Sequence, residues 1–197
     1  MTIKLGLTGS IGMGKSTTAR LFAEEGCDVW DADAAVHRLY APGGAAVEPM
    51  RALFPNAIVD GAVSRVALKE IIGSNPGALA QIEEIVHPLV AQDRASFVAH
   101  STADILVFDI PILFETGGDK AMDVTVVVSA PADVQRTRVL ERGTMSEEQF
   151  RQILFKQMPD AEKRARADHV IITDTVEHAR AQVQSVLKEI RGALADA

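Results

Sequence analysis

The sequence predicts an α/β fold built on a parallel sheet, and two observations predict it. Short apolar segments alternate with helical patterns along the whole chain, which is typical of parallel strands joined by helices. The first apolar segment, residues 3–8, leads into residues 9–16, which read GSIGMGKS and are followed by a helical pattern. These eight residues fit G-x-x-x-x-G-K-[ST] in the strand–loop–helix setting where that motif cradles phosphate groups. The sequence therefore predicts a nucleotide-phosphate site.

The motif assigns a task to each of its defining residues. Gly9, Gly12 and Gly14 permit a close backbone approach to an anion, because a side chain would block it. The backbone N–H groups and the helix N-terminus then surround one phosphate group. Lys15 should reach the β- and γ-phosphates, and the Ser16 hydroxyl should ligate Mg²⁺. We expect bound ATP and Mg²⁺ at this loop.

Composition limits the other possibilities. With 197 residues the chain suits a single domain, and its net charge of −7 argues against a nucleic-acid surface. Cys27 is the only cysteine, which fits a reducing compartment and core packing. No apolar run approaches the length of a membrane span, and the first residues are already strand and loop, which leaves no room for a signal peptide. We therefore expect a cytoplasmic protein without membrane or nucleic-acid partners.

Acidic residues follow the other predicted strands. The segments 28–30, 104–109, 124–128 and 168–173 read as strands two to five. In parallel sheets, ligands bind beyond the carboxyl ends of the strands, where Asp31, Asp33 and Asp109 fall. An extended segment would point Asp31 and Asp33 to one side, for catalysis or substrate binding, whereas a helix beginning nearby would use one of them as its N-cap. Asp109 could hold a Mg²⁺ water or the acceptor hydroxyl, or it could cap a helix or loop.

A long helical segment suggests where a kinase would bind its acceptor. Residues 40–100 are helical and poor in strands, a place to build an acceptor pocket, and Pro88 is expected to kink or restart a helix there. His87 before it is more often structural than catalytic in such a setting. Glu115, after the third strand, is equally compatible with a site and with the surface. Trp30 is expected in the core.

Residues 135–166 form a basic segment within an acidic chain. They hold eight Lys or Arg against five Asp or Glu. Gln135, Arg138 and Arg142 share one helical face, and Gly143 breaks that helix before a capping box at Ser146 opens the next. Arginine binds phosphate through two parallel hydrogen bonds, so this hairpin could close over a nucleotide as a lid. The alternative is a solvated pair of charged helices.

These patterns favour a small ATP-dependent phosphotransferase. A GTPase switch would need an Asn-Lys-x-Asp element, and the only asparagines, Asn56 and Asn75, are not followed by Lys. A dinucleotide-binding fold would need a different first loop. No spacing in the sequence identifies the acceptor.

Resemblance to a family extends the prediction. The motifs that carry it occur in the family's order and spacing through nearly the whole chain: GLTGSIGMGKST (6–17), Asp31-Ala-Asp33, His87-Pro88, DIPILFE (109–115), Gln135 with Arg138 and Arg142, Gln157-Met-Pro, and Lys163-Arg with Ala167-Asp168. Together they resemble the dephospho-coenzyme A kinase family. The resemblance implies transfer of the ATP γ-phosphate to the ribose 3′-hydroxyl of dephospho-CoA, the last step of coenzyme A synthesis.

It also implies an architecture and site roles. We expect a P-loop NTPase-type three-layer fold with five parallel strands in the order 2-3-1-4-5. Its core would consist of residues 1–39, 101–134 and 167–197. A helical acceptor lobe would span about 40–100, and a lid would span about 135–166. Carried over by motif, Gly12, Met13, Gly14, Lys15, Ser16 and Thr17 bind ATP phosphates. Asp33 orients or deprotonates the 3′-hydroxyl, Arg138 and Arg142 hold the transferring phosphate, and Asp31, His87, Asp109 and Glu115 line the acceptor side.

One position departs from the family pattern. The family usually carries Asn near a small-residue turn after the last strand, whereas this chain has Thr173. That loop lies where the adenine is expected, so base recognition is the affected property. Two other functions remain open from the sequence: a P-loop kinase with a nucleoside monophosphate or small polyol as acceptor, and an ATP-binding regulator without turnover. The expected partners are small-molecule substrates, and the expected assembly is a monomer or small homo-oligomer.

Overall fold

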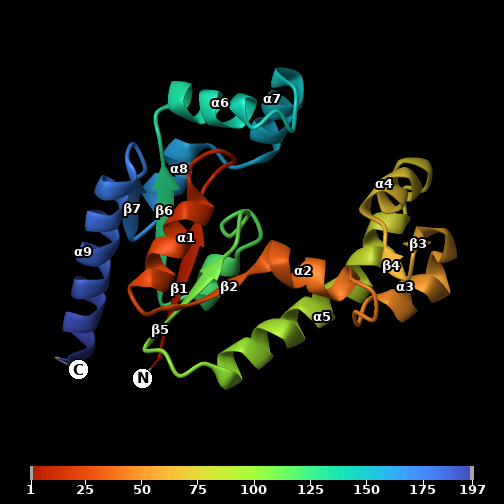
Figure 1. Cartoon of the computed structure of the whole chain (residues 1–197), viewed down its shortest axis with the longest axis horizontal. Helices are drawn as coiled ribbons and strands as arrows, with labels where there is room; N and C mark the ends of the chain where they lie inside the picture. Colours follow the sequence, from red (N-terminus) through yellow and green to blue (C-terminus); the bar gives the residue numbers. More distant parts are fainter. Residues whose placement is uncertain (1, 196–197) are drawn as a thin grey trace. The chain divides into compact units, whose positions relative to one another are not determined.

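Five strands form one sheet in the order β2-β5-β1-β6-β7 (Figure 1). They are β1 (Ile3–Thr8), β2 (Asp28–Asp31), β5 (Ile105–Asp109), β6 (Val124–Ser129) and β7 (His169–Ile172). The pairs β1–β5, β1–β6 and β6–β7 are parallel, so their carboxyl ends lie at one edge. Numbered within the sheet, this is the predicted order 2-3-1-4-5, which is confirmed. The structure is a computed structural model and describes residues 2–195.

The chain divides into two compact units. The larger unit consists of the chain up to Trp30 and from Thr102 onward, and it contains the sheet. The smaller unit is Asp31–Ser101 and is mainly helical. The boundary falls before Asp31, the last residue of β2, so helix α2 (Ala32–Tyr40) belongs to the smaller unit.

The sheet of the larger unit is covered on both faces. Helices α1 (Lys15–Glu24) and α9 (Val176–Ala195) pack against each other and against the sheet, and together they enclose one buried apolar cluster. Alternate strand residues face the other way, where β6 contacts α8 (Asp160–Arg166). Burial of both faces explains why the strands read as continuous apolar runs in the sequence.

The predicted core positions of Cys27 and Trp30 are confirmed. Cys27 is 5% exposed, and burial raises the pKa of its thiol to about 11. A thiol with so high a pKa stays protonated and unreactive near neutral pH. Trp30 is 4% exposed, and its ring centroid lies 6.1 Å from that of Phe108.

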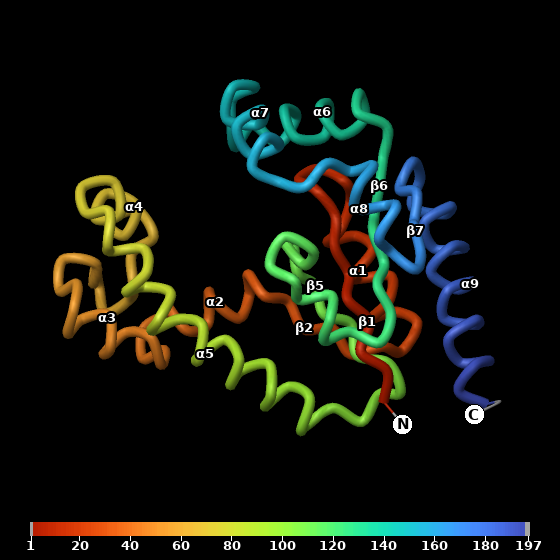
Figure 2. The backbone as a smooth tube through the Cα atoms, turned by 180° about the vertical axis from the view of Figure 1, so that it is seen from behind, coloured from red at the N-terminus to blue at the C-terminus, as the bar shows by residue number. Residues whose placement is uncertain are grey.

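A helical hairpin connects the fourth and fifth strands of the sheet. Figure 2 shows the chain leaving β6 through α6 (Ala132–Glu141) and α7 (Glu147–Lys156) and returning through α8 to β7. Gly143 has a φ of 64° at the break between α6 and α7, and the predicted capping box at Ser146 is present. An ion pair of 2.6 Å between Arg136 and Glu147 joins the two helices and, with Arg151, lowers the pKa of Glu147 to about 2.

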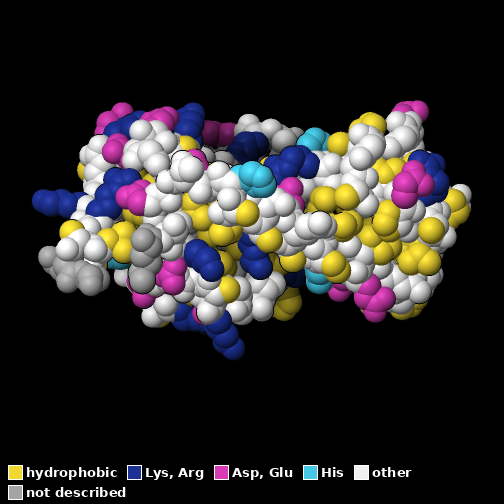
Figure 3. All heavy atoms as spheres, turned by 90° about the horizontal axis from the view of Figure 1, so that it is seen from below, with side chains coloured by type: hydrophobic (Ala, Val, Ile, Leu, Met, Phe, Trp, Pro, Cys, Tyr) yellow, Lys and Arg dark blue, Asp and Glu magenta, His cyan; other side chains and the backbone are white. Residues whose placement is uncertain are grey.

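The smaller unit has its own apolar core. Helices α2, α3 (Val47–Leu53), α4 (Arg65–Ser74) and α5 (Ala78–His100) enclose a cluster that includes Tyr40, Met50 and Val86. Figure 3 shows hydrophobic side chains gathered on the surface of this unit, at the right of the view, and its exposed apolar residues include Leu53 and Val66.

The expectations for this region need two corrections. A two-stranded hairpin, β3 (Ile58–Val59) and β4 (Ala62–Val63), occurs where no strand was predicted. Its turn residues Asp60 and Gly61 have φ of 50° and 78°, the positive values that an Asp-Gly hairpin turn requires. The second correction concerns only one of the two alternatives at Pro88: helix α5 is continuous through this residue, so it does not restart there, and a kink stays a prediction.

None of the helices within residues 2–195 combines the length and the apolar character needed to cross a membrane. Helix α5 has 23 residues, and Glu83, Glu84, Asp93 and Arg94 interrupt its apolar character.

Candidate active site

The loop between β1 and α1 presents free backbone N–H groups to a ligand. Helix α1 begins at Lys15, and Gly14 occupies its N-cap position without a side-chain hydrogen bond. The first N–H groups of this helix are therefore available to an anion, which the helix dipole also favours. Gly12 and Gly14 have φ of 79° and 89°, and a Cβ at Gly14 would come 2.9 Å from the Thr173 hydroxyl. The loop shape therefore depends on these glycines.

Lys15 forms an ion pair with Asp109. Asp109 is the last residue of β5 and stands beside Leu7 in the register with β1, which ends one residue later and leads into the loop. The Lys15 side chain is 16% exposed and that of Asp109 is 2% exposed. Parallel strand order thus brings together two residues that are 94 positions apart and were both predicted for the site.

Thr173 connects the loop to the arginine-bearing helix. Its hydroxyl donates to the Met13 carbonyl oxygen at 2.7 Å and accepts from the Arg138 guanidinium at 3.1 Å. Arg138 also donates to the Thr173 backbone carbonyl. The residue that departs from the family pattern is therefore a buried link, 6% exposed, between the phosphate loop and α6.

A pocket of about 280 Å³ opens beside these groups. Its walls come from the loop, from the start of α1, from α6 and from the segment after β7, and its lining includes Gly14, Thr17, Arg138, Arg142, Thr173 and Val176. Four of these six were predicted as ATP-phosphate or catalytic residues. Two arginines and an uncapped helix N-terminus make the pocket suitable for an anionic ligand.

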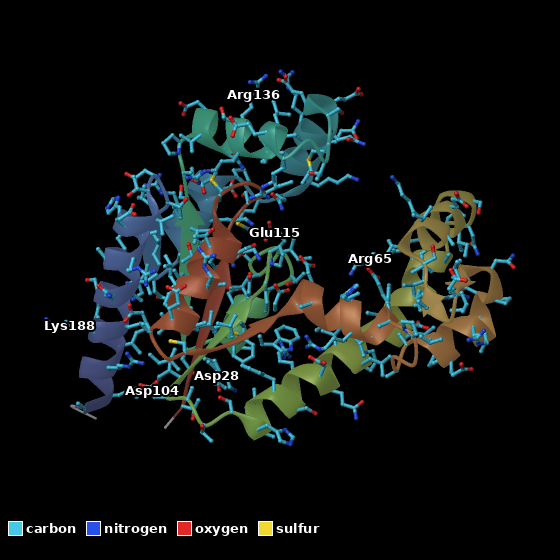
Figure 4. All side chains as sticks on the ribbon, viewed as in Figure 1. Asp28, Arg65, Asp104, Glu115, Arg136 and Lys188 are labelled. Atoms are coloured by element: carbon cyan, nitrogen blue, oxygen red, sulfur yellow. The ribbon has the colours of Figure 1, made fainter. Side chains whose placement is uncertain are left out.

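Glu115 lies on the segment after β5 (Figure 4). Its carboxylate accepts from the Lys163 ammonium at 2.8 Å and from the Met158 N–H at 2.9 Å. Burial alone would raise the pKa of Glu115, but the hydrogen bonds from Lys163 and Met158 outweigh it and the pKa is lowered. Lys163 is completely buried and also donates to the Pro111 carbonyl, which accepts a second bond from Thr8. Glu115 thus supports the segment that follows Asp109.

The burial of Lys163 could not be predicted from the local sequence pattern. A lysine in a charged helix is normally solvated. Only its place among the motifs of the resemblance marked it, and the structure supplies the reason, which is the ion pair with Glu115.

Three candidate residues lie in the smaller unit. Asp31 is the N-cap of α2, and its carboxylate accepts from the Ala34 N–H at 2.8 Å. Of the two alternatives at Asp31 and Asp33, the extended segment is excluded, because the helix begins at Ala32. Asp33 is exposed in the first turn of α2, and His87 is exposed on α5. The capping alternative therefore holds for Asp31, and Asp33 has no capping role.

The donor groups at the loop fit Mg²⁺. Ser16 and Asp109 offer hydroxyl and carboxylate oxygens, the ligands that Mg²⁺ prefers. Within residues 2–195 no group of three or more His, Cys, Asp or Glu could hold a metal by protein ligands alone. A site with so few ligands suits a Mg²⁺ ion whose remaining ligands are substrate phosphates and water.

The fold and this site define a P-loop kinase. Comparison with known proteins gives the particular family: residues 3–178 match the family model described as dephospho-CoA kinase, and the chain belongs to that family. Its relatives include the dephospho-CoA kinases of Ruegeria pomeroyi, 66% identical over 97% of both chains, and of Cereibacter sphaeroides, 60% identical over 95% of both chains.

Solved structures share this fold. A protein from Thermus thermophilus is 34% identical, with a TM-score of 0.85 over 95% of this chain and 97% of that chain. A shikimate kinase from Acinetobacter baumannii is 18% identical with a TM-score of 0.55, covering 98% of this chain and 95% of its own, and it supports the fold alone.

Proposed function

We propose that this chain transfers the γ-phosphoryl group of ATP to the ribose 3′-hydroxyl of dephospho-CoA, which is the last step of coenzyme A biosynthesis. One observation carries the choice of acceptor: the likeness to proteins named dephospho-CoA kinase extends over 97% of the chain. The donor site alone cannot make this choice, because kinases with other acceptors use the same phosphate loop.

The donor half of the reaction is assigned to the loop and to α6. The loop residues Gly12 to Thr17, Met13 and Ser16 among them, bind the ATP phosphates through the backbone N–H groups that the loop does not itself use, and Gly9 allows the loop to leave β1. When ATP binds, the Lys15 ammonium leaves Asp109 and contacts the β- and γ-phosphate oxygens. Arg138 and Arg142 neutralise the charge that spreads over the γ-phosphoryl oxygens, and this neutralisation accounts for much of the catalysis of phosphoryl transfer.

Ser16 and Asp109 are the residues proposed to hold Mg²⁺. When bound, the ion would neutralise phosphate charge and orient the γ-phosphoryl group. The Asp109 carboxylate already faces the Lys15 ammonium, so the same oxygen atoms can serve a second cation without a change of fold.

The acceptor half is assigned by family motif. Asp33 orients the 3′-hydroxyl and accepts its proton, and its exposed position on α2 leaves the carboxylate available. Asp31 and His87 are proposed to contact the acceptor. Glu115 is proposed to serve the acceptor side through the segment that it holds beside Asp109.

We also propose that the protein works in the reducing cytoplasm as a monomer or small homo-oligomer. The single buried cysteine supports a reducing location, because it leaves no internal disulfide to form.

The decisive experiment offers the protein MgATP with separate acceptors and identifies each product by mass. Dephospho-CoA should gain one phosphoryl group, whereas coenzyme A, whose 3′-position is already phosphorylated, serves as the matched control and should remain unchanged. Phosphorylation of a nucleoside monophosphate or a polyol in place of dephospho-CoA would contradict the proposed acceptor. ATP binding without turnover on any acceptor would indicate a regulator.

A further inference from the structure

Two glutamines hold one residue of the phosphate loop from opposite directions. The Gln135 side-chain amide donates to the Ile11 carbonyl oxygen at 2.7 Å. The Ile11 N–H donates to the Gln157 side-chain oxygen at 3.1 Å. Gln135 lies on α6 and Gln157 directly follows α7, so the pair brackets the helical hairpin that carries Arg138 and Arg142. We call Gln135 and Gln157 the glutamine pair.

The glutamine pair fixes the direction of the peptide group between Ile11 and Gly12. In a trans peptide the C=O and the following N–H point in opposite directions, and the described residues contain no cis peptide. Since the Ile11 carbonyl points at Gln135, the Gly12 N–H must point away from α6. Gly12 is the first of the residues whose backbone is assigned to the phosphates.

The preceding peptide group is fixed in the same way. The Ile11 N–H points at Gln157, so the Ser10 carbonyl points in the opposite direction, where it accepts from the Met13 N–H at 3.1 Å. The tip of the loop is therefore a closed turn whose outward polar groups are both satisfied by the glutamine pair. Ser10, Gly12 and Met13 are buried, so each of these bonds is largely protected from water.

Without these bonds the peptide between Ile11 and Gly12 could turn over. Glycine adopts positive and negative φ with similar ease, so the sequence itself offers little resistance to such a flip. A flipped peptide would present a carbonyl oxygen, in place of an N–H, to the phosphates and would repel them. Close packing also requires glycine at this position, because a Cβ at Gly12 would lie 2.6 Å from Val139.

We propose that Gln135 and Gln157 are positioning residues that keep the phosphate loop in its anion-binding conformation and place it in register with the arginines of the hairpin. They touch neither substrate and act through the Ile11 backbone. The inference rests on the proposed function for the identity of the nucleotide, but it concerns only the donor side. Binding of ADP therefore tests it independently of the acceptor.

The two glutamines differ in the group that they use, and that difference gives a sharp experiment. Gln157 accepts, so Gln157→Glu keeps an acceptor and should bind ADP within about threefold of the wild-type affinity. Gln135 donates, so Gln135→Glu places a carboxylate against the Ile11 carbonyl and should weaken ADP binding by about 30-fold. Gln157→Leu and Gln135→Leu each remove one hydrogen bond and should weaken it by about tenfold, the usual effect of one such bond. Binding is measured by isothermal titration calorimetry.

Two further readouts separate positioning from general damage. In steady-state assays the KM for ATP should rise in Gln135→Glu and in both leucine variants, whereas the KM for dephospho-CoA stays unchanged. Gln152→Glu, at an exposed glutamine of α7, adds the same charge as a control and should behave like the wild type. Thermal unfolding midpoints identify any variant that is simply unfolded. If the Gln135 variants are unfolded, the comparison of ADP binding by Gln157→Glu and Gln157→Leu decides alone.

Two results would overturn the inference. One is equal loss of ADP binding in Gln157→Glu and Gln157→Leu, because it would mean that the acceptor at position 157 is irrelevant. The other is wild-type ADP binding in all folded variants. A protein that binds ADP with this pattern but does not phosphorylate dephospho-CoA would support the glutamine pair and contradict the proposed acceptor, so the two failures are distinguishable.

Discussion

The candidate residues of the larger and smaller units are held in different ways. In the larger unit Lys15, Asp109 and Thr173 are tied to other parts of the fold, and the last two are almost completely buried. In the smaller unit Asp33 and His87 lie exposed on helices. These three residues therefore stabilise the fold as well as serving the site, whereas Asp33 and His87 have no such structural role. Substitutions should reveal this difference: changes at Lys15 should affect stability and turnover together, and changes at Asp33 should affect turnover alone.

The largest effect is expected from Lys15→Ala. Loss of the ammonium should lower turnover by about a thousandfold, because it removes positive charge that the γ-phosphoryl oxygens require. It should also lower the thermal midpoint, because Asp109 is buried and loses its ion pair with Lys15. A coupled assay of ADP release and a melting curve measure the two effects. The exposed Lys188 provides the matched control Lys188→Ala, which should change neither. Reduced turnover with full stability would show that the ion pair contributes nothing to the fold.

Asp33→Asn should give the opposite combination. Loss of the proposed base should lower kcat by at least about a hundredfold. ATP binding should remain, and the free energy of unfolding should stay within about 0.5 kcal/mol because the side chain is exposed. Calorimetry with ATP and urea unfolding test these points. Near-normal turnover in Asp33→Asn together with loss in Asp109→Asn would mean that the two acids have been assigned in the wrong order.

Lys163→Met tests whether the network of Glu115 and Lys163 acts as a structural element. Removing one partner of a buried ion pair should lower the free energy of unfolding by about 3 kcal/mol. The double variant Lys163→Met/Glu115→Gln should recover part of the loss, because no carboxylate is then left unpaired. Urea unfolding followed by Trp30 fluorescence measures both, and equal stability of wild type and Lys163→Met would contradict the expectation.

The same pair should respond to pH. The pKa of Glu115 is lowered in the folded protein, from a model-peptide value of 4.5. Stabilisation by the pair is therefore complete above that value and is lost as pH falls through the lower, folded-state pKa. The difference in stability between wild type and Lys163→Met should be constant near neutral pH and should shrink in strong acid.

The smallest effect is expected from Asp31→Ala. Its carboxylate caps α2, so its loss should destabilise that helix by about 1 kcal/mol, whereas Asp31→Asn retains a capping side chain and should cost little. Hydrogen exchange should accelerate by about fivefold in the α2 amides of Asp31→Ala and should be unchanged in β1. Equal acceleration in both units would contradict a local effect. A raised KM for dephospho-CoA in Asp31→Asn would identify a role in acceptor binding beyond the cap.

Local patterns predicted some details of the fold well and missed others. The capping box at Ser146 was predictable, because both of its hydrogen bonds join residues three positions apart. The hairpin at Asp60-Gly61 was equally local and could have been found from that dipeptide between two pairs of apolar residues. The sequence left two alternatives open at Asp31, because the same acid can end a strand or cap a helix and the sequence does not say where the helix begins.

The sequence by itself determined the phosphate loop, the apolar strands and, through family motifs, their order. These are properties of short segments and of their succession, so they are visible before any folding. Only the tertiary structure decided which side chains meet across the chain: Lys15 with Asp109, Thr173 with Met13 and Arg138, Glu115 with Lys163, and the glutamine pair with Ile11. Each of these contacts joins residues more than 30 positions apart. Their hydrogen bonds depend on packing that no local pattern encodes.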